Sequence, residues 1–316
     1  MFGFIFLLFF ISFLISLFLI IFLLKISEKG KFFDIPWGDA LKIHKLPISY
    51  LGGLAMILSA IAGLVLASFF YKNFYLQIVG IILSAAVIFL LGFWDDLRWK
   101  HISKIKPCRK FLFLIILSLL ASIFLMFGGL RISFFSNIYL GIFLTAGYIF
   151  IFINAVNYQD GMDGLAAGLA AISLVGFIAL SAISGNIFSL FFSAVILGAV
   201  LGFLAFNFPA AKIFMGDSGA YFIGFILVVL ASFYSKHYNI LSLVGSIFIV
   251  GVPIFEGVFT NIRRILRKKS IFLGDRSHFY DRLLQKGFSA QKTLFVFYSI
   301  QFLFVAAGVI ITAITL

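Results

Sequence analysis

Ten apolar segments in this chain are long enough, or nearly long enough, to cross a lipid bilayer, and no soluble fold buries so many. A helix needs about 20 apolar residues to cross the roughly 30 Å hydrocarbon core. The segments are residues 2–24, 50–71, 76–93, 111–129, 138–156, 164–183, 187–206, 219–234, 238–259 and 293–315. We expect one all-α, polytopic integral membrane domain over residues 1–316 with about ten transmembrane helices. A different division of the nearly continuous stretch 160–206 gives eleven.

Charged residues divide unevenly between the two sides of this predicted bundle. The Lys and Arg residues number 24, and all but three fall on one side; the exceptions are Lys72, Arg131 and Lys236. Such an excess of positive charge marks the cytoplasmic side, so both termini are expected on the opposite side. The 11 acidic residues also lie on the basic side or at its helix ends, which its longer loops explain in part.

The net charge of +13 suits anionic lipid headgroups, a phosphorylated lipid or a nucleotide near the membrane surface. With membrane spans in place, we expect membrane lipids and no nucleic acid as partners.

The third segment ends in G-F-W-D-D (Gly92–Asp96). Adjacent carboxylates do not both ionise cheaply unless a cation lies near them. Mg²⁺ is a natural partner, because it takes one or two carboxylates together with substrate phosphates. A solvated turn at a helix end is the structural alternative for Asp95 and Asp96.

A second acidic motif, F-M-G-D-S-G (Phe214–Gly219), comes directly before another apolar run. Its glycines permit close backbone approach. Asp217 and Ser218 could cap the next helix, and a helix N-terminus is also a site for anions. A cap and a phosphate or metal site are compatible roles for Asp217.

The most specific stretch is N-A-V-N-Y-Q-D-G-M-D-G-L (Asn154–Leu165), which interrupts apolar sequence without a Lys or Arg. Asp160 and Asp163 could bind a metal, sugar hydroxyls or a base edge, with Asn154 orienting one of them. An irregular re-entrant turn is the alternative.

The last basic-side loop, Asn261–Ala290, is the longest. His278, Asp281 and Arg282 are spaced to share one face of a short amphipathic helix. Basic side chains beside the histidine would suit a diphosphate, whereas a purely structural histidine is the alternative.

Taken together, these motifs resemble the polyprenyl-phosphate N-acetylhexosamine-1-phosphate transferases (glycosyltransferase family 4), in family order from about Asp34 to Leu284. Further matches are Asp34, Pro36, Lys42, His44, Pro47 and Gly52–Gly53 near the start, and Asn207, Pro209 and Ala210 before Phe214. The resemblance implies transfer of a sugar 1-phosphate from a UDP-N-acetylhexosamine to polyprenyl (undecaprenyl) phosphate, with release of UMP. It also implies Mg²⁺, with Mn²⁺ as a substitute, a bacterial inner-membrane location with a cytoplasmic active site, and compatibility with a homodimer.

The resemblance assigns roles to individual residues. Asp217 corresponds to the Mg²⁺ ligand, and Asp95 to the residue proposed to take the proton from the lipid phosphate, with Asp96 beside it. His278 corresponds to the first histidine of the family's final-loop motif and is the third predicted catalytic residue. The predicted substrate-binding residues are Lys42, His44, Lys110, Asn154, Asn157, Asp160, Asp163, Asn207 and Arg282.

The chain departs from the family pattern at two places. Tyr280 and Asp281 stand where the family often has further histidines, so the three-histidine pattern of the branch that uses UDP-MurNAc-pentapeptide is absent. This favours enzymes that start O-antigen or another surface glycan. Glu256 follows Pro253 where the family pattern has Asp.

Two other classes of function remain open from the residues. A secondary transporter of an anionic nucleotide or lipid would favour charges near the bilayer midplane and paired repeats with broken helices. A lipid-binding scaffold would not need the Asp pair or Asp217. Within the transferase class, GlcNAc, QuiNAc and FucNAc donors, and direct or covalent mechanisms, are all compatible with the sequence.

Overall fold

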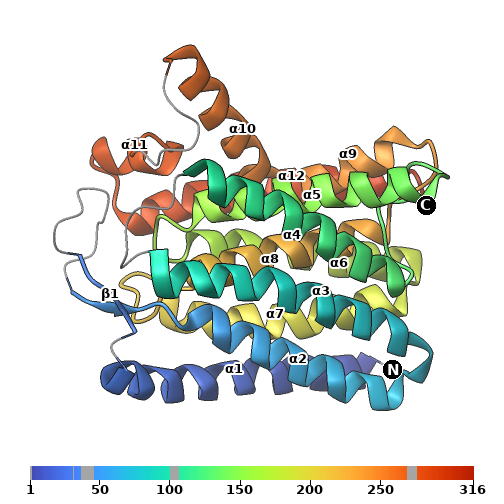
Figure 1. The fold of residues 1–316 in the computed structure, drawn as a ribbon, viewed down its shortest axis with the longest axis horizontal. Coiled ribbons are helices and arrows are strands. Elements are labelled where there is room, and N and C mark those ends of the chain that lie inside the picture. The colour runs from blue at the N-terminus through green and yellow to red at the C-terminus, as the bar shows by residue number, and fades with distance from the viewer. Residues whose placement is uncertain (1, 31, 37–45, 100–106, 269–275) are drawn as a thin grey trace.

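A computed structural model describes residues 2–30, 32–36, 46–99, 107–268 and 276–316 and consists of long helices packed side by side (Figure 1). The α-helices are α1 (Phe2–Gly30), α2 (Gly52–Phe70), α3 (Tyr75–Trp94), α4 (Pro107–Phe127), α5 (Ile138–Gln159), α6 (Leu165–Ser184), α7 (Ile187–Asn207), α8 (Gly216–Ser232), α9 (Ile240–Ile249), α10 (Gly251–Leu266), α11 (Phe279–Gln285) and α12 (Ala290–Ala313). Two short turns of helix, η1 (Lys72–Phe74) and η2 (Asp95–Trp99), and two strands, β1 (Phe33–Asp34) and β2 (Ile48–Ser49), complete the described elements.

The predicted fold class is confirmed. Among the described residues, eight helices are long and apolar enough to cross a membrane, and the pair α9–α10 makes a ninth if it counts as one span. The remaining predicted span, residues 219–234, corresponds to α8, which begins at Gly216 rather than at residue 219 and is only 17 residues long. The nearly continuous stretch 160–206 divides into α6 and α7, close to the predicted boundaries.

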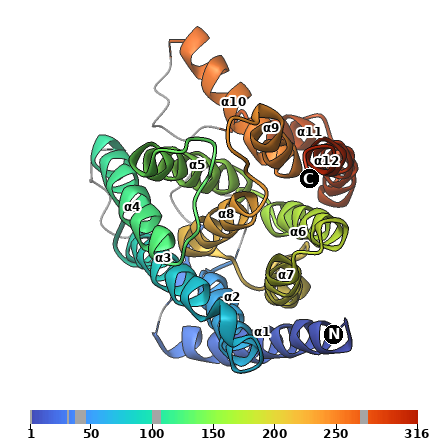
Figure 2. The same cartoon turned by 90° about the vertical axis from the view of Figure 1, so that its right-hand side faces the viewer.

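Helix α8 forms the centre of the bundle (Figure 2). It contacts α2, α3, α5 and α6, and every one of its residues except Asp217 is buried. Neighbouring helices rather than lipid therefore surround α8, which allows it to be shorter than the spans around it. Asp217 lies at the first turn of this buried helix, so its position is fixed by four neighbouring helices.

The expectation of one continuous span over 238–259 is wrong, because the chain bends by 92° between α9 and α10. Pro253 has no N–H to donate to the Ile249 carbonyl, and its ring would clash with that carbonyl in a continuous helix. Gln301 of α12 compensates: its Nε2 donates to Ile249 O at 2.9 Å, and its Oε1 accepts from Val252 N at 2.9 Å. Helix α10 consequently points away from the bundle (Figure 1).

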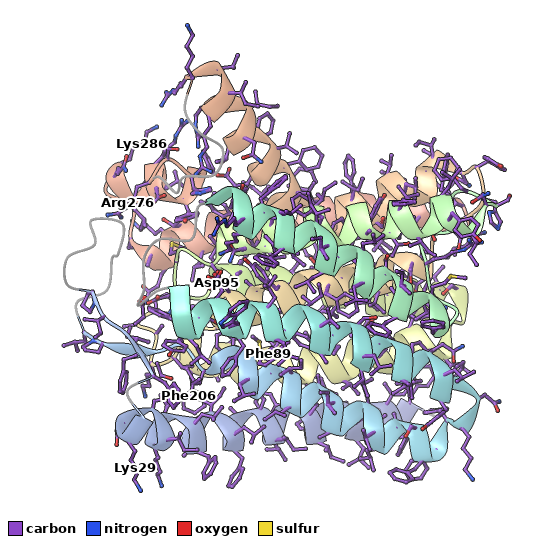
Figure 3. All side chains as sticks on the ribbon, in the orientation of Figure 1. Lys29, Phe89, Asp95, Phe206, Arg276 and Lys286 are labelled. Carbon is purple, nitrogen blue, oxygen red and sulfur yellow. The ribbon has the colours of Figure 1, made fainter. Side chains whose placement is uncertain are left out.

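The motifs gather at the end of the bundle opposite the two chain termini (Figure 1). Figure 3 shows Lys29, Asp95, Arg276 and Lys286 at this same end. At the same end β1 pairs antiparallel with β2, and Ser49 of β2 forms a parallel bridge with Ile213. This pairing ties the segment before α2 to the segment before α8.

Candidate active site

The Asp95–Asp96 pair lies where α3 passes into the π-helical turn η2, against the start of α8. Gly92 makes this approach possible, because a Cβ at that position would lie 2.5 Å from the Ser218 Cα. Both carboxylates are withdrawn from solvent: Asp95 is 5% exposed and Asp96 is 0% exposed. The pair is therefore not the solvated turn that the sequence left open.

Asp96 caps α8 from another helix. Its Oδ1 accepts the backbone N–H of Asp217 at 2.9 Å, and its Oδ2 accepts the backbone N–H of Ser218 at 3.1 Å and the Ser218 hydroxyl at 2.8 Å. The first N–H groups of a helix lack intrahelical partners and carry partial positive charge, so a buried carboxylate is stable there. Gly216 has a φ of +68°, and a Cβ on it would overlap the Asp96 carboxylate.

Asp95 faces a different partner, the ammonium group of Lys110 from α4. Lys110 Nζ forms ion pairs with Asp95 Oδ2 and, at 2.7 Å, with Asp217 Oδ2. Asn157 Nδ2 of α5 donates to the other Asp217 oxygen at 2.9 Å. Side chains from α3, α4, α5 and α8 thus meet at one point, with two carboxylates on one cation.

Tyr221, which the sequence analysis did not single out, lies beneath this cluster. It is buried, and Lys110 Nζ lies 5.8 Å from the centre of its ring. The sequence could have pointed to Tyr221, because it follows Asp217 by four residues and residues four apart share a helix face. The ring gives the cluster an apolar floor with a favourable face for the ammonium group.

The remaining residues of the Asn154–Leu165 motif have different surroundings. Asn154 Nδ2 donates to Phe150 O of its own helix at 2.7 Å, and half-buried Asp160 ends α5. Asp163 Oδ2 accepts the Ala211 N–H at 2.9 Å. These contacts leave the predicted substrate-binding roles as predictions.

Asn207 fixes the turns around the site. Its Oδ1 accepts the Gly164 N–H at 3.0 Å, and its Nδ2 donates to Ile213 O at 2.9 Å. Asn207 is 3% exposed, so its side chain joins the loop before α6 to the segment before α8. The predicted residues Lys42 and His44 lie outside the described residues.

A second cluster surrounds His278. The predicted short helix is observed as α11, but it begins at Phe279, so His278 precedes it in extended backbone rather than sharing a helix face with Asp281 and Arg282. His278 Nδ1 lies 3.2 Å from Glu256 Oε1, and the imidazole stacks on Tyr280 and packs on Tyr158. Burial, followed by the nearby negative charges, raises the pKa of Tyr280, so its hydroxyl stays protonated. Sequence reasoning left Glu256 without a role and missed Tyr158.

The two clusters meet at the end of α5. Asn157 contacts Asp217, whereas its neighbour Tyr158 packs on His278. Arg282 is half-buried in α11, and Asp281 of that helix is ion-paired with Arg276 at 3.6 Å. Burial raises the pKa of Asp281.

The carboxylates of this site resemble the partial set of ligands that binds a cation together with phosphate oxygens. They do not form a complete coordination shell by themselves. Among the described residues, no group of three or more His, Cys, Asp or Glu side chains is arranged to hold a metal ion. Asp95 and Asp217 converge, however, and Mg²⁺ commonly takes only one or two protein carboxylates beside phosphate oxygens and water. These residues fit such an ion.

Comparison with known proteins identifies the family to which this chain belongs. A family model described as glycosyl transferase family 4 matches residues 78–235, a range that includes the whole carboxylate–lysine cluster. The probable undecaprenyl-phosphate N-acetylglucosaminyl 1-phosphate transferase of Bacillus subtilis (strain 168) is 36% identical over 285 residues, which cover 87% of this chain and 76% of the relative.

Two further relatives extend the comparison. The decaprenyl-phosphate N-acetylglucosaminephosphotransferase of Mycobacterium leprae (strain TN) is 29% identical, over 81% of this chain and 71% of the relative. The phospho-N-acetylmuramoyl-pentapeptide-transferase of Dictyoglomus turgidum (strain DSM 6724 / Z-1310) is 31% identical, over 88% of each chain. The predicted resemblance, with its glycan-initiating branch, is confirmed by the family match and the two N-acetylglucosamine relatives. The chain is a multi-pass membrane protein that belongs to glycosyl transferase family 4.

Proposed function

We propose that the protein transfers N-acetylhexosamine 1-phosphate from a UDP-sugar to polyprenyl phosphate and releases UMP, as the first step of a surface glycan such as O-antigen. The names of the Bacillus and Mycobacterium relatives support GlcNAc as the sugar. The observation that carries the proposal is the convergence of Asp95, Lys110 and Asp217 from three helices at one end of the bundle.

The reaction brings two anionic phosphates together, so it depends on positioning and on charge neutralisation. An oxygen of the lipid phosphate attacks the β-phosphorus, and the bond from that phosphorus to the oxygen bridging the two phosphates breaks. UMP leaves with the bridging oxygen. Asp95 accepts the proton of the lipid phosphate, and the Lys110 ammonium neutralises phosphate charge beside it.

Asp96 acts in this scheme as a positioning residue. Both of its oxygens accept hydrogen bonds from the start of α8, so it is engaged in holding Asp217. Asn157 orients the Asp217 carboxylate from the other side. The pair Asp95–Asp96 thereby divides into a reacting carboxylate and a supporting one.

We propose Mg²⁺, with Mn²⁺ as a substitute, at Asp217 with support from Asp95. Such an ion, held by these residues, would neutralise negative charge on the diphosphate. His278 and Arg282 contact the diphosphate or sugar from the final loop. Asn154, Asp160, Asp163 and Asn207 line or shape the nucleotide side of the site, and Lys42 and His44 are proposed to bind substrate.

The sidedness of the charges supports a cytoplasmic active site in the bacterial inner membrane. Lys29, Arg276 and Lys286 lie at the same end of the bundle as Asp95 (Figure 3), and positively charged loops remain in the cytoplasm. UDP-sugars are cytoplasmic metabolites, so donor and site would share a compartment.

UMP release from a panel of UDP-N-acetylhexosamines tests the proposal. Purified protein is incubated with each donor, with and without polyprenyl phosphate and with and without Mg²⁺. Release that requires both the lipid and Mg²⁺ supports the transferase and names the sugar. A folded protein that releases UMP from none of the donors contradicts it, and a trapped phosphorylated enzyme contradicts direct attack.

A further inference from the structure

Glu256, to which the reaction above assigns no role, has its carboxylate at the centre of a hydrogen-bond cluster. A single oxygen, Oε1, accepts from the Phe279 backbone N–H at 2.9 Å and from the Thr260 hydroxyl at 3.1 Å. The same oxygen lies 3.2 Å from His278 Nδ1. We propose that Glu256 is a positioning residue that holds the imidazole by Nδ1 and directs Nε2 toward the substrate diphosphate, an inference that rests on the proposed function.

The donor and acceptor roles follow from the chemistry of the groups. An ionised carboxylate has no proton to donate, so the hydrogen bond to His278 requires the proton on Nδ1. The Thr260 hydroxyl, 3.4 Å from Nδ1, already donates to Glu256 and does not compete for this role. Within the described part of the chain, every hydrogen bond of the ring is made by Nδ1, which leaves Nε2 for the substrate.

The ring plane is fixed as well as the ring nitrogen. The Tyr280 ring is parallel to the imidazole, with an interplanar angle of 1° and centres 5.4 Å apart. Tyr158 packs on it at 5.6 Å. His278 is 5% exposed, so few other orientations fit in this space. A ring constrained in plane and in tautomer is what a group aimed at a diphosphate requires.

Charge on Glu256 is needed to bind all three donors at one atom. Hydrogen bonds to an ionised carboxylate are roughly twice as strong as those to a neutral amide oxygen, so a Gln at this position would hold the three donors more weakly. The backbone N–H of Phe279 makes the shortest of the three contacts and the imidazole the longest. We therefore expect Glu256→Gln to keep the loop contact and to loosen His278.

The bend before α10 determines where Glu256 lies. Glu256 and Thr260 are four residues apart and share one face of α10, whose direction is set by the break at Val250. A straight α9–α10 helix would carry both side chains elsewhere. The break that shortens the membrane span is thus also what brings Glu256 to the final loop.

Nitrogen-15 NMR of histidine-labelled full-length protein in nanodiscs tests the contact without any substrate. The chain has four histidines, and His278→Asn identifies the signals of His278. The expected result is a protonated Nδ1 in the wild type and a shift toward the Nε2-protonated form in Glu256→Gln. Asp281→Asn, which removes a carboxylate near His278 that pairs with Arg276 instead, is the matched control and should leave these signals in place.

Turnover supplies the second measurement. Loss of the partner that orients a metal-ligating histidine typically lowers activity by roughly 10–100-fold, and we expect a loss of the same order for Glu256→Gln. In a His278→Asn background, Glu256→Gln should lower turnover by less than a further twofold. Unchanged His278 signals, or a full additional loss in that background, would overturn the inference. If the wild type releases no UMP, the proposed function fails, and the NMR result still decides whether Glu256 fixes the ring.

Discussion

The Asp96 carboxylate accepts the backbone N–H of Asp217 at 2.9 Å, although 121 residues separate the two aspartates. Asp96 therefore holds the start of α8, while the Asp217 side chain points to Lys110 and Asn157. The two carboxylates therefore have separate roles: that of Asp96 accepts backbone N–H groups, whereas that of Asp217 pairs with the Lys110 ammonium.

This division predicts different outcomes for the two neighbours at the end of α3. Asp96→Asn places an amide N–H₂ group against the N–H donors of α8 and should lower the free energy of unfolding by about 2–3 kcal/mol, together with activity. Asp95→Asn should lower turnover by about 100-fold or more, with little change in melting temperature. Thermal melts and UMP release on both variants provide the comparison; equal stability losses would contradict separate roles.

Gly216 should tolerate no side chain. Gly216→Ala combines a positive φ, which costs a non-glycine residue about 1–2 kcal/mol, with overlap on the buried Asp96 carboxylate. Gly185→Ala is the matched control, because its φ is +70° but a Cβ there meets nothing within 4 Å. We expect Gly216→Ala to be the less stable by about 1–3 kcal/mol in melting experiments. Similar melting temperatures for the two would argue against the overlap.

Removal of the Lys110 ammonium should make the site depend more on a divalent cation. Lys110→Met leaves Asp95 and Asp217 facing each other without their shared cation, so Mg²⁺ should raise its melting temperature more than that of the wild type. Turnover should fall by about 100-fold or more. Arg109→Met changes the adjacent, exposed cation and should affect neither quantity. An equal Mg²⁺ response in Lys110→Met and the wild type would contradict this.

Gln301 should stabilise the bend before α10. Gln301→Leu leaves the Val252 N–H without its acceptor, at a cost of about 1–3 kcal/mol, whereas the Ile249 carbonyl keeps the Ser173 hydroxyl, which donates to it at 2.9 Å. Ser173→Ala removes a hydroxyl that accepts from the Gln301 amide at 2.9 Å and donates to Ile249 O at 2.9 Å, but it leaves Gln301 on both backbone groups and should destabilise less. Melting temperatures rank the two variants, and the opposite order would show that the break does not need Gln301.

Asn157 and Asn154 should differ although they belong to one motif. Asn157→Ala removes the amide that donates to Asp217 Oδ1 and should reduce turnover at limiting Mg²⁺ by about tenfold, the effect of about 1.4 kcal/mol. The Asn154 amide donates to its own helix rather than to Asp217, so Asn154→Ala should leave the Mg²⁺ dependence unaltered. Its proposed role in substrate binding predicts a higher KM for the UDP-sugar. A Mg²⁺ titration of UMP release separates them.

Much of this protein could be predicted from the pattern of its sequence. The apolar runs specify the membrane spans because hydrocarbon tolerates few alternatives to a helix. The distribution of charged residues predicted that the motifs lie at one end of the bundle, and the structure confirms this. The interruption of the 238–259 run could have been anticipated from Pro253, since proline removes a helical hydrogen bond, but its 92° angle could not.

Tertiary structure alone decided which residues of the motifs act on which. Asp95 and Asp96 are equivalent in the sequence, yet a helix turns by about 100° from one residue to the next, so they face different partners. Lys110 meets Asp217 across 107 residues, and Glu256 meets His278 only because α10 leaves the bundle. Periodicity and spacing determine local elements and the side of the membrane, whereas contacts between distant helices depend on how those helices pack.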